Sequence, residues 1–173
     1  MQASLPIKNK NTHMKKSIYQ SELMLNMNER LFLNALEGVN DEQARERLSS
    51  HSNPLIWIAT HTVWARYNML ALLGKPAKNP FDGKFENFKA YDANDNYPSL
   101  ESVKTEWRNA SKLLKEALDG VSEEHLAAES PFKSPIDDFT NGGAIAFLAQ
   151  HESYDIGQMG FLKKYYSKEA MKY

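Results

Sequence analysis

Four long stretches of this chain repeat apolar residues with the period of an α-helix, and this pattern limits the fold more than any other feature. The stretches cover residues 17–36, 54–73, 99–119 and 142–164. No stretch alternates apolar and polar residues persistently enough to predict a β-strand. Four amphipathic helices without strands are typical of an all-α protein, so the sequence predicts a four-helix bundle.

Turn-forming residues mark the ends of the second helical stretch. Asn53 is a suitable N-cap, Pro54 suits the first helical position, and Gly74 followed by Pro76 ends the helix. The connection to the third stretch, residues 75–98, is too long for a tight antiparallel turn and therefore predicts a crossover. Its aromatic residues indicate a segment that packs on the bundle; a lid over an active site is the alternative.

Length and composition agree with a single domain. A chain of 173 residues with 42% hydrophobic residues can build one core but is too short for two ordinary domains. The 21 Lys and Arg residues are balanced by 22 Asp and Glu residues, which argues against a nucleic-acid-binding surface. Because the chain has no cysteine, any bound metal needs nitrogen and oxygen ligands.

The hydropathy pattern predicts a cytoplasmic protein that does not enter the membrane. No apolar run reaches the roughly 18 to 20 residues that a membrane span needs. Residues 1–13 are polar and predict a disordered leader before a domain of residues 14–173, and Met14 offers a second start. Gln20, Glu22 and Asn26 interrupt the apolar segment that a secretory signal after Met14 would require.

The chain contains a weak internal repeat. Residues 35–43 (ALEGVNDEQ) match residues 117–125 (ALDGVSEEH), and the second helical stretch aligns with the fourth at a slightly larger offset. His61 and His151 occupy equivalent positions in this alignment. Two copies of a helical hairpin related by a two-fold axis would place these two histidines face to face.

His151 and Asp155 stand four positions apart in the last helical stretch, so they lie one above the other on one helix face. With His61 they form a set of two imidazoles and one carboxylate from two facing helices. Such a set leaves open positions on a bound metal and suits a divalent ion, zinc and nickel first, then iron and manganese. The metal can lower the pKa of a bound water or thiol.

Simpler interpretations exist for the individual residues. A His and an Asp at this spacing often only hydrogen-bond to each other, although a buried carboxylate without a cation is costly. Arg66 and Glu152 each lie one position after a residue of the apolar face of their helix, Ala65 and His151 respectively. Their side chains are therefore expected to face solvent or the rim of the bundle. The other aromatic residues of the helices are interpreted as core packing: Trp57, Trp64, Trp107 and Tyr154.

Two segments resemble a known family, the DinB/YfiT-like metalloenzymes. They are residues 53–61 (NPLIWIATH), whose helix ends at Leu73-Gly74, and above all residues 151–158 (HESYDIGQ). The resemblance extends over residues 14–166. It implies an up-down-down-up bundle whose metal is held by one His on the second helix and a His-x3-His pair on the fourth. His61 and His151 match two of these ligands, and Asp155 stands where the third His is expected.

The resemblance also implies a function. Enzymes of this family use the metal to activate a low-molecular-weight thiol for transfer to a small electrophile, or to hydrolyse small amide-like substrates, and they are frequently homodimers. The resemblance therefore implies a metal-dependent thiol transferase, with a hydrolase as the alternative. A helical binding protein without catalysis, with a degenerate metal site, is the competing class.

Overall fold

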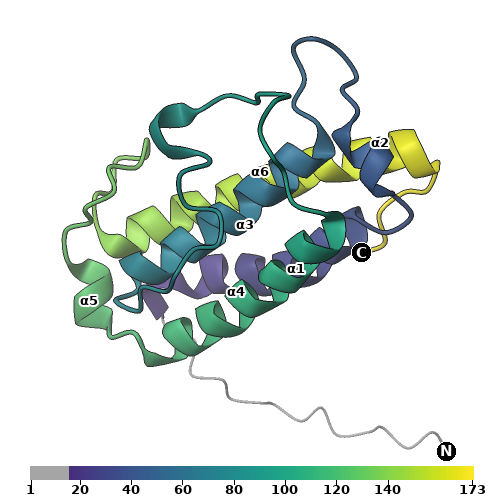
Figure 1. The fold of residues 1–173 in the computed structure, drawn as a ribbon. Coiled ribbons are helices and arrows are strands. Elements are labelled where there is room, and N and C mark those ends of the chain that lie inside the picture. The colour runs from purple at the N-terminus through teal and green to yellow at the C-terminus, as the bar shows by residue number, and fades with distance from the viewer. Residues whose placement is uncertain (1–15) are drawn as a thin grey trace, which may run out of the picture.

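The computed structural model describes residues 16–173, and within this part every regular element is a helix (Figure 1). The all-α prediction is confirmed, because no strand occurs among the described residues. None of the helices in this range is long and apolar enough to cross a bilayer. In chain order the elements are η1 (Lys16–Ile18), α1 (Tyr19–Ala35), α2 (Asp41–Arg45), α3 (Leu55–Leu72), η2 (Glu86–Phe88), α4 (Leu100–Gly120), α5 (Glu123–Ala127) and α6 (Asn141–Ser167).

The four longest helices, α1, α3, α4 and α6, form the body of the molecule (Figure 1). Helix α6 packs along both α1 and α3, and α4 packs along α3 and also contacts α1. These are the four helices that the sequence predicts, with bounds that differ by only a few residues. Their up-down-down-up order stays a prediction, and the predicted leader, residues 1–13, lies outside the described residues.

The helix ends follow from local chemistry. The hydroxyl of Ser99 caps α4 and that of Thr140 caps α6, each by accepting a hydrogen bond from a backbone N–H of the first turn. Pro54, predicted as the first helical residue of α3, is its N-cap residue. At the other end of α3, Gly74 has a φ of 72°, which lets the N–H of Lys75 donate back to a carbonyl of the last turn.

The long connection between α3 and α4 packs against the body of the molecule, as its aromatic residues predict. Phe81, Phe85 and Tyr97 are buried. The side-chain amide of Asn79 donates to the carbonyl of Trp64 on α3 (3.0 Å) and accepts from the N–H of Phe81 (3.0 Å). The segment is therefore fixed to α3 by both apolar and polar contacts, and it brings Phe85 close to the candidate site.

A buried ion pair joins α3 to α6. Arg66 donates from Nε and Nη2 to the two carboxylate oxygens of Glu152, at 2.8 and 2.7 Å. The expectation that these two residues face solvent or the rim is wrong, because each is only 1% exposed. Both helices are packed on two sides, so the position next to the apolar stripe also faces the interior.

The same guanidinium also contacts the other two long helices. Arg66 Nη1 donates to the hydroxyl of Ser111 on α4 (2.6 Å), and Nη2 donates to the carbonyl of Leu25 on α1 (3.1 Å). Its planar head lies over the ring of Trp107 on α4, 3.7 Å from the ring centroid. One side chain of α3 thus bonds to the other three long helices. A planar fork of five donors is suited to this geometry.

We predict that Arg66→Ala destabilises the protein by about 3–5 kcal/mol, because it leaves the Glu152 carboxylate buried without a partner. Urea unfolding of the variant and the wild type measures the difference. The exposed Glu129–Lys133 pair on the surface provides a matched control, since Lys133→Ala removes an ion pair that water already screens. An Arg66→Ala protein that unfolds at the wild-type midpoint contradicts this role of the ion pair.

Candidate metal centre

Three side chains with metal-ligand chemistry come together between α3 and α6. His61 lies on α3, and His151 and Asp155 lie one helical turn apart on α6. The Nδ1 atom of His151 is 3.5 Å from Asp155 Oδ2, and His61 Nε2 is 4.0 Å from the same oxygen. One potential ligand atom from each residue lies within 4.8 Å of the others. The arrangement can hold a metal ion.

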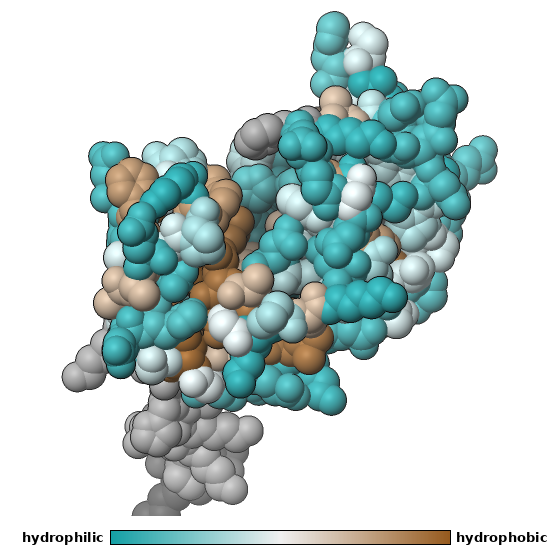
Figure 2. Space-filling model, turned by 60° about the vertical axis from the view of Figure 1, so that its left-hand side comes forward, coloured by the Kyte–Doolittle hydropathy of each residue, from teal (hydrophilic) through white to brown (hydrophobic). Residues whose placement is uncertain are grey.

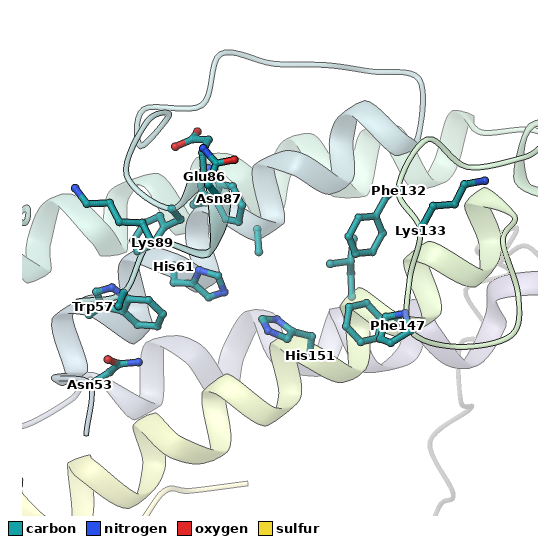
Figure 3. Close-up of a pocket in the computed structure, with 16 residues that line it drawn as sticks. Asn53, Trp57, His61, Glu86, Asn87, Lys89, Phe132, Lys133, Phe147 and His151 are labelled. Carbon is teal, nitrogen blue, oxygen red and sulfur yellow. The ribbon is translucent and has the colours of Figure 1, made fainter. Parts of the chain in front are cut away.

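The two histidines face each other, as the internal repeat predicts. Their ring centroids are 5.4 Å apart and their planes are nearly perpendicular, at 69°. In Figure 3 the ring of His61 approaches from α3 and that of His151 from α6. The alignment of the second and fourth helical stretches therefore identified the histidine that lies next to His151.

Two neighbours position the carboxylate of Asp155. The hydroxyl of Thr62, on α3, lies 3.4 Å from Asp155 Oδ2, and the side-chain amide of Gln158, on α6, donates to Oδ1 at 3.3 Å. Sequence reasoning did not assign these roles. The available signal was their position, since Thr62 follows His61 directly and Gln158 lies three residues after Asp155 on the same helix face.

Burial controls the charge of all three groups. It raises the pKa of Asp155 to about 7, and the hydrogen bond from Thr62 offsets only part of that shift. Burial lowers the pKa of His61 to about 4, with a further contribution from the charge of His151, and it also lowers the pKa of His151. Near neutral pH both imidazoles are therefore neutral, the form that binds metals.

The two histidines also line an apolar cavity of about 750 Å³. His61 stacks on Trp57, with ring centroids 5.1 Å apart and planes within 10°, and the edge of Phe85 meets the His61 ring at 5.1 Å. On α6, the ring of Phe147 lies 5.9 Å from that of His151. Ligand positions on a metal here would therefore open toward an aromatic pocket.

A model of the DinB superfamily matches residues 24–159, which is more than half of the chain. The chain belongs to the DinB superfamily. The matched segment contains His61, His151 and Asp155. No curated protein matches this DinB-superfamily chain.

The donor set of this superfamily member fits a divalent metal. Although His151 Nδ1 is buried and close to Asp155, it makes no hydrogen bond to a described residue. The simpler interpretation, a His–Asp pair that satisfies itself, therefore lacks its hydrogen bond. His61 Nδ1 is also buried without a hydrogen bond to a described residue. A divalent cation would stabilise this arrangement of one buried carboxylate beside two neutral imidazoles.

The other two histidines in the described part of this DinB-superfamily chain, His51 and His125, lie away from the site. His51 is exposed, and His125 Nε2 lies 2.8 Å from the carbonyl of Leu72 at the end of α3. His13 lies outside the described residues. The histidines that come together are therefore the two that the sequence selected.

The prediction of core packing for four aromatic residues is correct for Trp107, which is fully buried. Trp57 and Trp64 are half-buried against the core and also form part of the cavity wall, whereas Tyr154 is 62% exposed. Helical spacing alone cannot distinguish a residue that faces the core from one that faces a pocket next to the core.

We predict that Asp155 makes the metal-free protein less stable as the pH rises from 4 to 7. Its unfolded form ionises near 3.8, whereas its folded form keeps the proton up to about 7. The free energy of unfolding then falls by at most about 1.4 kcal/mol per pH unit and levels off above pH 7. Asp155→Asn removes this dependence.

The measurement is urea unfolding of both proteins in the presence of a chelator at several pH values. His61 acts in the opposite direction, since its lowered pKa costs stability as the pH falls from 6.5 toward 4. The difference between wild type and Asp155→Asn cancels this contribution, which is present in both proteins. A difference that does not change with pH contradicts the raised pKa of Asp155.

Proposed function

We propose that this member of the DinB superfamily binds a divalent metal ion through His61, His151 and Asp155. We propose further that it uses the metal to activate a low-molecular-weight thiol for transfer to a small electrophile. The observation that carries the proposal is the convergence of these side chains beside an apolar cavity. Zinc and nickel suit such a nitrogen and oxygen ligand set best, and iron and manganese are the alternatives.

A divalent metal, when bound, lowers the pKa of a coordinated thiol so that it is a nucleophile near neutral pH. The protein supplies the neutral imidazoles of His61 and His151, which burial keeps unprotonated. Asp155 supplies negative charge once a cation displaces its proton, because its raised pKa means that without a cation it keeps that proton up to about pH 7. Thr62 and Gln158 hold the carboxylate in place.

Asp155 stands where the resemblance leads us to expect a third histidine. Its carboxylate is buried and lies near both imidazoles, which supports the interpretation that aspartate replaces histidine as a ligand. Carboxylate oxygen is a harder ligand than imidazole nitrogen, so the replacement shifts the metal preference of the site without removing a ligand.

The apolar cavity favours thiol transfer over hydrolysis. Aromatic side chains occupy most of its wall next to the histidines and keep bulk water from that side, while leaving room for a second substrate.

The proposal also includes the up-down-down-up order of the helices. It is supported by contacts of α6 with α1 through Asn28 and Ser153, and with α3 through Arg66 and Glu152. The homodimer and the cytoplasmic location stay predictions.

The test is a set of activity assays on the metal-loaded protein. A panel of small thiols is offered with the electrophile 1-chloro-2,4-dinitrobenzene, and a panel of small amides is offered separately. We expect thiol-dependent product that disappears in the variants His61→Ala and Asp155→Asn, because each loses one ligand. His51→Ala serves as the matched control, since this histidine is exposed and outside the candidate site.

Three outcomes would contradict the proposal. Amide hydrolysis without thiol transfer would assign the same ligands to the alternative reaction. Thiol transfer that survives in both ligand variants would show that the reaction does not use this site. Inactivity of the metal-loaded protein in every assay would favour the non-catalytic binding protein.

A further inference from the structure

The cavity beside the candidate ligands has aromatic walls on two sides. In Figure 3 Phe132 and Phe147 lie on one side, Trp57 and His61 lie on the other, and His151 lies between them. The rings of Phe132 and Phe147 are 5.9 Å apart and tilted by 31°, so they form a continuous apolar surface. Figure 2 shows a hollow whose deep surface is hydrophobic and whose edges are hydrophilic.

The charged groups around this cavity already have partners. Lys89 Nζ lies 2.8 Å from a carboxylate oxygen of Asp95, and Lys133 pairs with Glu129. The carboxylate of Glu86 accepts a hydrogen bond of 2.7 Å from a backbone N–H of the same segment. The described lining therefore offers no unpaired Lys or Arg side chain to a ligand carboxylate.

We propose that this cavity binds a neutral aromatic molecule, which would be the acceptor of the thiol in the reaction proposed above. The inference rests on that proposed function for the assignment as acceptor, but the binding itself depends only on the cavity. The volume of about 750 Å³ is in the range of pockets that enclose small organic ligands.

Two physical arguments select this ligand class. In the metal-free protein, a carboxylate in the apolar cavity would lose its water without gaining a charged partner from the lining, which is costly. An aromatic ring gains more than an aliphatic ring of similar size, because it can place its edge or face against the surrounding rings. The wall presents rings in several orientations, since Phe85 meets Trp57 edge-on at 83° while His61 is nearly parallel to Trp57.

The test uses the full-length protein as purified, and again after chelation of any metal. N-phenyl-1-naphthylamine, a neutral aromatic probe whose fluorescence rises in apolar surroundings, reports binding directly. Three competitors of similar size then displace it: 2-naphthol, its saturated analogue decahydro-2-naphthol, and the anion 2-naphthoate. In the chelated protein we expect decahydro-2-naphthol to compete several-fold more weakly than 2-naphthol, and 2-naphthoate to compete about tenfold more weakly.

Two variants locate the probe. Phe147→Ala and Phe132→Ala each remove one ring from the cavity wall, and we expect each to weaken probe binding several-fold. Phe161→Ala is the matched control, because Phe161 is an exposed aromatic residue on the same helix as Phe147 but outside the cavity. Phe132 is partly exposed in a loop, so its removal does not threaten the fold.

Equal competition by 2-naphthol and either of the other two compounds overturns the inference, as does unchanged probe binding in both cavity variants. The metal site and the pocket are tested separately by this design. Probe binding to a protein that never binds metal would remove the proposed function and leave the aromatic pocket. Metal binding without probe binding would overturn the aromatic pocket and leave the proposed function in place.

Discussion

The ion pair between Arg66 and Glu152 is the interaction on which the rest of the structure depends. Arg66 lies on α3, and its guanidinium has partners on each of the other three long helices: Glu152 on α6, the hydroxyl of Ser111 on α4 and the carbonyl of Leu25 on α1. A buried pair of this kind contributes little net stability compared with apolar packing. Its hydrogen bonds, however, are satisfied in only one arrangement of the surrounding helices. It therefore specifies how these helices align.

The same pair fixes the candidate metal centre. Glu152 directly follows His151 on α6, and Arg66 lies five residues after His61 on α3. Because the two hydrogen bonds between guanidinium and carboxylate set the register of α3 against α6, they also set how closely His61 approaches His151 and Asp155. The helices turn one face toward the core and the adjacent face toward the aromatic cavity. The residues of the ion pair and the candidate metal ligands thus lie close together in sequence on the same two helices.

The helices and the proximity of His61, His151 and Asp155 could be predicted from the sequence, because they follow from helical spacing and from the internal repeat. The helical period showed four helices, and the internal repeat paired His61 with His151. Which side of a helix is buried depends on its neighbours, and this was harder to predict. Arg66 looked like a surface residue. On α1, Leu23 and Met27 are 46% and 44% exposed, whereas the polar Asn28 is buried and bonds to Ser153 on α6.

The metal content of the protein tests the central claim most directly. After purification without an affinity tag, wild type is expected to carry about one divalent metal ion per chain, and His61→Ala to carry none, because two ligands hold such an ion poorly. Wild type prepared without metal should gain thermal stability when zinc or nickel is added. A wild-type protein that contains no metal and whose melting temperature does not respond to either ion would contradict the account.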